Sequence, residues 1–167
     1  TTSSAASDVY KRQDEDLVRR MVAEGRKGDR ARGEILFESA RAGCIACHKI
    51  GNQGGMIGPE LSAVGSGVPA DRIVTEVLWP ARQVKGGYAL SRITMRDGRV
   101  LQGYLQESRD KKLLLLRDFA GAGMQEVEAE MVTKEEPIGS LMPPTAQSLS
   151  RDELSDLFAY LFSLVGK

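Results

Sequence analysis

Cys44-Ile45-Ala46-Cys47-His48 is the stretch that decides which fold this sequence predicts. Two cysteines one helical turn apart can each form a thioether with a vinyl group on one porphyrin edge, and the histidine directly after them can bind the iron. The chain has two cysteines and one histidine, all within this stretch. The motif therefore predicts one covalently attached haem c, held by Cys44 and Cys47, with His48 as an axial iron ligand.

Three other interpretations of these residues are open. A structural zinc site needs four ligands, usually Cys and His, and the chain offers three such side chains crowded into five consecutive residues. A thioredoxin-like redox pair normally follows a strand, whereas a helical pattern precedes this motif and a glycine-rich stretch follows it. The third interpretation is a chance occurrence with no site. Haem attachment is the hypothesis that the composition favours.

The composition limits the classes of function. The 167 residues fit one domain or a small domain with an insertion, and the 41% apolar residues are sufficient for a hydrophobic core. The net charge of zero gives no reason to expect nucleic acid or an anionic membrane as a partner. No apolar run approaches the roughly 18 residues of a membrane span. We therefore expect neither nucleic-acid binding nor a membrane span.

The start of the chain bears on localisation. No charged and then apolar signal peptide opens the sequence, and residues 1–7 have the composition of a linker or a trimmed boundary. Bacteria attach haem to such motifs outside the cytoplasm. We therefore expect a periplasmic or otherwise extracytoplasmic protein, present here as a mature form or as a domain excised from a longer chain.

Helical periodicity is found at both ends of the sequence. Residues 8–32 combine dense charges with a narrow apolar stripe, which predicts a solvated helix packed along one edge, with a docking element as the alternative. The stripe consists of Leu17, Val18, Met21 and Val22. Further helices are predicted over 31–42 and 70–78. Ser150 and Glu153 form a capping box that opens the last helix.

From Tyr88 to about Val132, apolar residues recur at every second position, and Asp97-Gly98 has the sequence of a hairpin turn. This pattern predicts three or four antiparallel strands within an otherwise helical chain. We therefore expect an N-terminal linker and charged helix over residues 1–30 and a main domain over 31–167, with a β insertion at about 88–132. The insertion is interpreted as a lid over a haem edge or as a docking surface for a redox partner.

If the iron is six-coordinate, methionine is the usual second axial ligand where no second histidine exists. Met142 is the best of the six candidates, since Pro143 and Pro144 restrict its backbone and so pre-position the side chain. Met56 lies too close to His48 in sequence to reach the opposite face of the haem easily. We therefore predict His48 and Met142 as the iron ligands, with packing of Met142 against the haem edge as the alternative.

Apolar residues after the motif are expected to enclose the haem. The expected set is Ile45, Ile57, Leu61, Val64, Ile73, Val77 and Trp79. Donors for a haem propionate are expected just beyond the third helix, where Arg82, Lys85 and Tyr88 lie, although each is also compatible with simple exposure.

Five features stand in a particular order along the chain. They are Gly33 with Phe37, the Cys44–His48 motif, Gly58-Pro59, Met142-Pro143, and Leu157-Phe158-Ala159-Tyr160-Leu161. This order resembles class I cytochrome c. The resemblance implies a mainly α fold around one haem, with the β insertion between the third helix and the distal methionine loop.

The same resemblance implies two contacts. The first and last helices of that family cross closely, and the matching residues here are Gly33, Phe37 and Tyr160. A proline carbonyl accepts the Nδ1 proton of the haem histidine, and the matching residue is Pro59, which would fix the tautomer of His48 and increase its electron donation to iron.

More narrowly, residues 31–165 resemble the haem-binding domain at the C-terminus of large multidomain proteins of planctomycetes and verrucomicrobia. Tyr88, the stretch 96–103 and Ser140-Leu141-Met142-Pro143 carry this resemblance. It implies one-electron transfer without enzymatic activity, with a dehydrogenase, an oxidase or the parent multidomain chain as redox partner. The alternative is a haem-based sensor or haem enzyme in which Met142 is displaced, although no further histidine is present as a distal acid or base.

Overall fold

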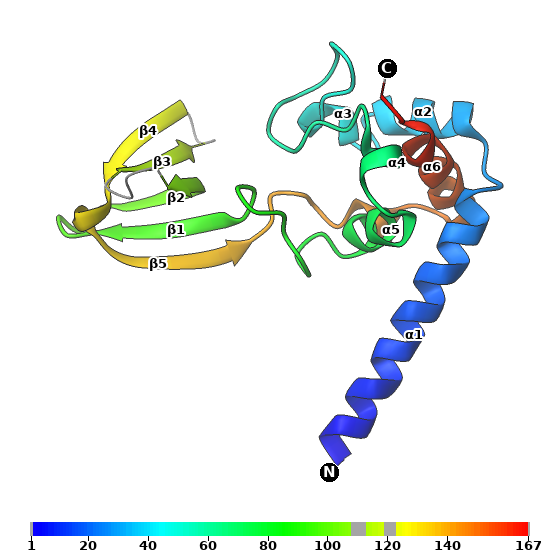
Figure 1. The fold of residues 1–167 in the computed structure, drawn as a ribbon, viewed down its shortest axis with the longest axis horizontal. Coiled ribbons are helices and arrows are strands. Elements are labelled where there is room, and N and C mark those ends of the chain that lie inside the picture. The colour runs from blue at the N-terminus through cyan, green and yellow to red at the C-terminus, as the bar shows by residue number, and fades with distance from the viewer. Residues whose placement is uncertain (1, 108–112, 119–122, 167) are drawn as a thin grey trace. The chain divides into compact units, whose positions relative to one another are not determined.

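The chain forms two compact units in this computed structural model, which describes residues 2–107, 113–118 and 123–166 (Figure 1). One unit, here called the helical unit, runs to Trp79 and resumes at Pro144. The other, called the β unit, comprises Pro80–Pro143. Residues 1–30 do not form a unit of their own, because their helix belongs to the helical unit.

The prediction of a mainly α, class I cytochrome c fold is wrong for this chain. About 45% of the residues are helical and about 19% lie in strands, and the strands form an antiparallel sheet within a separate unit. The sheet has its own core around Ile93, Met95 and Val127. The fold is therefore α+β, since the segment expected as a small insertion buries enough apolar surface to form a second core.

Six α-helices and one 3₁₀ turn are described in the helical unit. They are α1 (Thr2–Gly25), α2 (Arg30–Glu38), α3 (Cys44–Cys47), α4 (Val64–Gly67), α5 (Ala70–Leu78), η2 (Thr145–Ser148) and α6 (Arg151–Ser163). Helix α5 has the predicted bounds, whereas α2 ends four residues earlier than predicted. None of the helices in the described residues is both long and apolar enough to cross a membrane.

Helix α1 packs one edge on the core, as its apolar stripe predicts. Met21 is buried, and Leu17, Val18 and Val22 lie half-buried against the main core cluster. The helix begins earlier than the charge pattern indicated, at Thr2.

Helices α2 and α6 cross at Gly33. A Cβ atom on Gly33 would lie 1.9 Å from the carbonyl oxygen of Asp156, so only glycine allows this approach. Beside the crossing, the Phe37 and Tyr160 rings pack with their centroids 5.5 Å apart. The helix crossing implied by the resemblance is therefore confirmed, and Phe37 and Phe158 form the centre of the core.

The starts of both helices are fixed by side chains. Ser150 and Glu153 form the predicted capping box at the start of α6. Asp29 caps α2, and its own backbone N–H donates to Asp156 at 2.6 Å. Asp156 also accepts from the guanidinium of Arg32 at 2.7 Å, which holds the pKa of this buried carboxyl below its usual range. No sequence pattern predicts this link between the two helices.

Replacing Asp156 with asparagine should lower the free energy of unfolding at neutral pH by about 1.5–3 kcal/mol, because a buried charged hydrogen bond is lost. The folded-state pKa of Asp156 is lowered, so its stabilising effect is present above the unfolded-state pKa and is lost as the pH falls through the folded-state value. Denaturant unfolding should be measured at neutral and at strongly acidic pH. The difference in free energy of unfolding between the wild type and the variant should be smaller in acid. Asp16→Asn, which breaks an exposed pair with Arg19, is the matched control and should change little. Equal effects of both substitutions would contradict the assignment.

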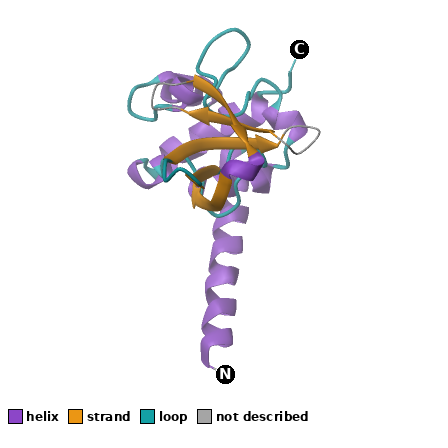
Figure 2. Cartoon of the chain, turned by 90° about the vertical axis from the view of Figure 1, so that its left-hand side faces the viewer, coloured by secondary structure: helices purple, strands orange, loops and turns teal. Residues whose placement is uncertain are grey.

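The β unit is an antiparallel sheet with strand order β4-β3-β2-β1-β5 (Figure 1). Its strands are the orange arrows of Figure 2. The strands are β1 (Leu90–Met95), β2 (Val100–Glu107), β3 (Leu113–Asp118), β4 (Gly123–Glu128) and β5 (Val132–Gly139), with the 3₁₀ turn η1 (Ala129–Met131) before β5. The predicted hairpin at Asp97-Gly98 is confirmed, with Gly98 at φ 84°. The predicted span of 88–132 ends one strand too early, since β5 returns to pair with β1.

Strand β5 was missed because its sequence is that of an edge strand. Its side chains are mostly exposed, and it carries Lys134, Glu135, Glu136 and Pro137. Charges and proline are common on sheet edges because they prevent further strand pairing, but they hide the apolar alternation on which the prediction relied.

Candidate functional site

The two cysteines lie on the single turn of α3. Gly43 precedes this turn in the left-handed conformation, with φ 67°, and His48 follows it in an extended conformation. The His48 backbone N–H donates to the carbonyl of Cys44 at 2.9 Å and closes the turn. Both thiols are free and half-buried. The structure thus presents two uncommitted thiols at i and i+3, with an imidazole directly after them.

The glycine-rich loop over residues 51–59 wraps around this turn. Gly55 N–H donates to the carbonyl of Ile45 at 2.9 Å, and Gly58 N–H donates to that of Cys47 at 2.8 Å. These bonds satisfy carbonyls that the end of a short helix leaves without partners. The glycine-rich stretch that follows the motif in the sequence is therefore a loop folded around α3.

Close backbone contacts explain the glycines of the loop. A Cβ atom on Gly55 would lie 2.0 Å from the carbonyl oxygen of Ala46. A Cβ atom on Gly58 would lie 2.6 Å from Cε1 and 2.8 Å from Nδ1 of His48. The backbone of Gly58 therefore forms one wall against the imidazole ring. Sequence reasoning did not assign this role, although the density of glycines next to the motif was a usable signal.

The imidazole of His48 is held through one nitrogen. Nδ1 lies 2.8 Å from the carbonyl oxygen of Pro59 and donates to it, as the resemblance implied. Nε2 has no hydrogen-bond partner in the described part of the chain and is not sealed off from solvent. Burial lowers the pKa of His48, so the neutral imidazole prevails at neutral pH. The lone pair for a metal is therefore on Nε2.

The Cys44 thiol is not activated for redox exchange. Burial raises its pKa to about 11, and Sγ donates weakly to the carbonyl of Ala42 at 3.7 Å. A thiol–disulfide catalyst needs a thiolate, which this environment disfavours. The structure therefore gives no support to the thioredoxin-like alternative. Among the described residues, no group of three or more His, Cys, Asp and Glu side chains is arranged to hold a metal ion.

Most of the expected apolar residues belong to the core cluster of the helical unit, against which Cys44 also packs. Ile45, Leu61, Val64 and Val77 are half-buried against the main core, and Ile73 is buried within it. Ile57 is half-buried in the loop next to Gly58, and Trp79 is half-buried at the end of α5. Cys44 thus lies against the same apolar core as most of the residues expected to enclose the haem.

Other predicted site residues belong to the β unit. Met142 is half-buried there, one residue before the boundary, and its N–H donates to Ser140 Oγ at 3.1 Å. Tyr88 packs edge-on against Tyr104, with ring centroids 5.6 Å apart, and Lys85 Nζ lies 6.0 Å from the Tyr88 centroid. The structure brings Cys44, Cys47, His48 and Pro59 together. The roles of Met142, Tyr88, Arg82 and Lys85 stay predictions.

Comparisons with known proteins add no family to this description. No protein-family model matches the sequence, and no curated protein matches it. The geometry around His48 is therefore the basis on which a function is proposed.

Proposed function

We propose that this chain is a monohaem c-type electron carrier, with one haem c bound covalently through Cys44 and Cys47 and with His48 as the proximal ligand. One observation carries the proposal. The His48 imidazole is fixed through Nδ1 by Pro59 and leaves Nε2 accessible, directly after two free thiols on one helical turn. This donor set fits a haem c, which needs two thiols at this spacing and one imidazole nitrogen.

The residues of the chain would prepare that group for electron transfer. The Pro59 carbonyl keeps the proton on Nδ1, which fixes the tautomer and makes Nε2 a stronger donor. The wall at Gly58 limits rotation of the ring, and the half-buried residues around α3 keep water away. When bound, the haem iron supplies a one-electron couple whose potential depends on its axial ligands and on burial.

Haem attachment is tested by expressing the chain in a host with c-type maturation machinery. Denaturing mass spectrometry should show the polypeptide plus one haem, and a pyridine haemochrome spectrum should identify it as haem c. The double variant Cys44→Ser, Cys47→Ser should lose covalent haem and keep the circular dichroism spectrum of the wild type. Colourless wild-type protein from such a host would overturn the proposal.

Met142 is proposed as the distal ligand, on the strength of its proline-braced sequence. A Met-to-iron charge-transfer band in the oxidised spectrum should vanish in Met142→Ala. It should persist in Met56→Ala, because Met56 is 66% exposed and serves as the matched control. If the wild type lacks this band, the carrier hypothesis gives way to a haem-based sensor or enzyme with an open sixth position.

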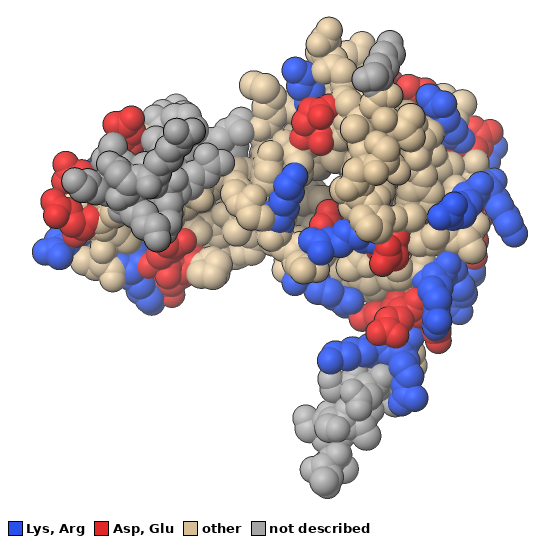
Figure 3. Space-filling model, in the orientation of Figure 1, with Lys and Arg blue, Asp and Glu red and all other residues tan. Residues whose placement is uncertain are grey.

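A carrier of this kind needs partners. We propose an extracytoplasmic location and an electron-donating dehydrogenase or another respiratory protein as partner, either separate or part of a longer chain. Positive and negative side chains are intermixed over the visible face of the helical unit (Figure 3), so a partner would meet local charges instead of one broad field. Stopped-flow reduction of the haem-loaded protein by a candidate dehydrogenase, at increasing salt concentration, tests this part directly.

A further inference from the structure

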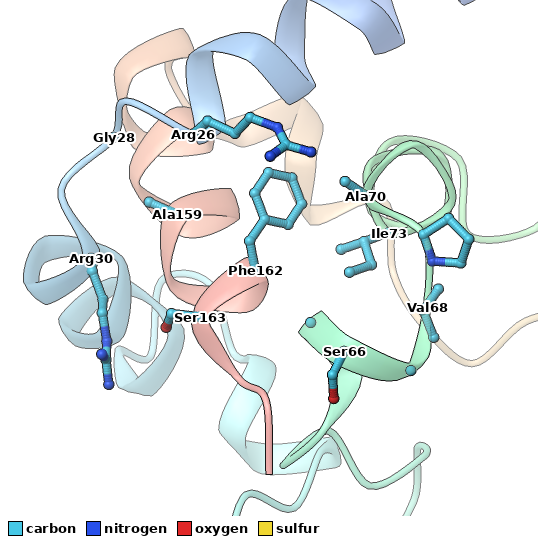
Figure 4. Close-up of a pocket in the computed structure, with 14 residues that line it drawn as sticks. Arg26, Gly28, Arg30, Ser66, Val68, Ala70, Ile73, Ala159, Phe162 and Ser163 are labelled. Carbon is cyan, nitrogen blue, oxygen red and sulfur yellow. The ribbon is translucent and has the colours of Figure 1, made fainter.

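A cavity in the helical unit lies outside the cysteine motif (Figure 4). Its volume is about 870 Å³, within the range of small-molecule sites. It lies between the end of α1, the segment from α4 to α5, and α6. The lining includes Arg26, Arg30, Gly67, Val68, Ile73 and Phe162. Cys44, Cys47 and His48 do not line it.

The cavity has an apolar floor that the backbone keeps open. Phe162, Ile73 and Val68 face it, and none of their side chains can hydrogen-bond a ligand (Figure 4). Gly25 packs so closely on α6 that a Cβ atom would lie 2.6 Å from Phe158, which keeps α1 close to α6. Gly67, by contrast, has nothing within 4 Å of a built Cβ. A side chain added at Gly67 would therefore meet no atom of the described chain beyond its sequence neighbours and its own helix backbone.

The charges that line the cavity are of one sign. Arg26 and Arg30 line it, and no acidic residue does. Neither arginine has an ion pair or a side-chain hydrogen bond with the described residues, whereas Arg32, Arg41, Arg72 and Arg151 all pair with carboxylates. The Arg26 side chain reaches over Phe162 toward Ala70 (Figure 4). The Arg26 guanidinium thus lies over the apolar surface of Phe162 and has no carboxylate partner among the described residues.

We infer that this cavity binds a small amphipathic anion, namely an organic carboxylate with an aliphatic chain. The chain would lie on Phe162, Ile73 and Val68, and the carboxylate would pair with Arg26, whose planar guanidinium can bind both oxygens at once. Arg30 lies at the opposite end of the cavity, on the side of Ser163, and adds to the positive potential (Figure 4). The Cys44–His48 motif does not line this site, and Ile73 belongs both to the cavity lining and to the apolar set expected to enclose the haem.

Isothermal titration of the full chain with decanoate tests the inference. Decanoate should bind saturably at one site, and decan-1-ol, which lacks the charge, should bind at least about tenfold more weakly. Arg26→Gln should weaken decanoate binding by a similar factor, while Lys27→Gln, which removes the same charge from the neighbouring residue outside the cavity, should not. Gly67→Leu should fill the cavity and abolish binding, while Gly86→Leu, an equally open glycine in the β unit, should leave it unchanged.

Three results would overturn the inference. One is an unchanged dissociation constant for decanoate in Arg26→Gln or in Gly67→Leu, with the circular dichroism spectrum confirming that the variant is folded. Another is equal binding of decanoate and decan-1-ol, which would indicate apolar contact without anion recognition. The third is no saturable binding of decanoate by the wild type, which would leave the cavity to a protein side chain or to solvent.

Discussion

Gly33→Ala should unfold the helical unit at much lower denaturant concentration than the wild type. The added methyl group would lie 1.9 Å from the Asp156 carbonyl oxygen and 2.9 Å from Cβ of Tyr160. Because the obstructing oxygen belongs to the backbone of α6, α2 and α6 must move apart to make room for the methyl group. This separation disrupts the Phe37–Tyr160 packing and the Arg32–Asp156 pair. We expect a loss of more than about 3 kcal/mol, a large part of a typical domain's stability. Urea unfolding followed by circular dichroism measures it.

Gly67→Ala is the matched control for this prediction. It adds the same methyl group to another helical glycine, where nothing lies within 4 Å. Its free energy of unfolding should stay the same or rise by about 0.4–1 kcal/mol, because alanine reduces the entropy of the unfolded chain. A loss below about 1 kcal/mol in Gly33→Ala would show that the two helices do not depend on this contact.

Gly58→Ala should displace the imidazole of His48. The new Cβ would overlap three ring atoms at 2.6–3.1 Å, so the ring must turn and the 2.8 Å bond from Nδ1 to Pro59 must break. In the haem-loaded protein, loss of such a supporting hydrogen bond should weaken imidazole ligation by about ten- to a hundredfold. Competition with added imidazole, followed by absorption, measures the change.

The same variant has a readout that does not depend on haem. Nitrogen-15 NMR of the haem-free chain should show the wild-type His48 protonated on Nδ1, and Gly58→Ala should show a mixture of tautomers. Gly86→Ala, at an open glycine, should leave both measurements unchanged. A single Nδ1-protonated tautomer in Gly58→Ala would mean that the loop adapts and that Gly58 does not position the ring.

The part of the site that could be predicted from sequence is local. The cysteine spacing, His48 and Pro59 lie within 16 consecutive residues, and short-range geometry fixes how they meet. The α5 bounds and the Ser150 capping box follow from similarly local signals. The crossing at Gly33 is long-range, and it was anticipated through the family resemblance.

What the sequence did not predict depends on contacts between distant segments. Strand β5 is positioned by its pairing with β1, about 40 residues earlier in the chain. Its exposed charged residues hide the apolar alternation typical of a strand. The link between Asp156 and the start of α2 has no sequence pattern of its own, because in a sequence a buried helical carboxylate cannot be distinguished from an exposed one. The fold class was wrong for a related reason: periodicity shows strands, but not whether they close a separate core.

The pairing of Leu90 with Gly139 has a consequence for the history of this chain. These residues open β1 and close β5, and as register partners their Cα atoms lie within about 5.5 Å of each other. A module whose entry and exit points are adjacent can be gained, lost or exchanged by recombination with little disturbance to its host. The segment Pro80–Pro143, which has a core of its own, thus has the anatomy of a transferable cassette.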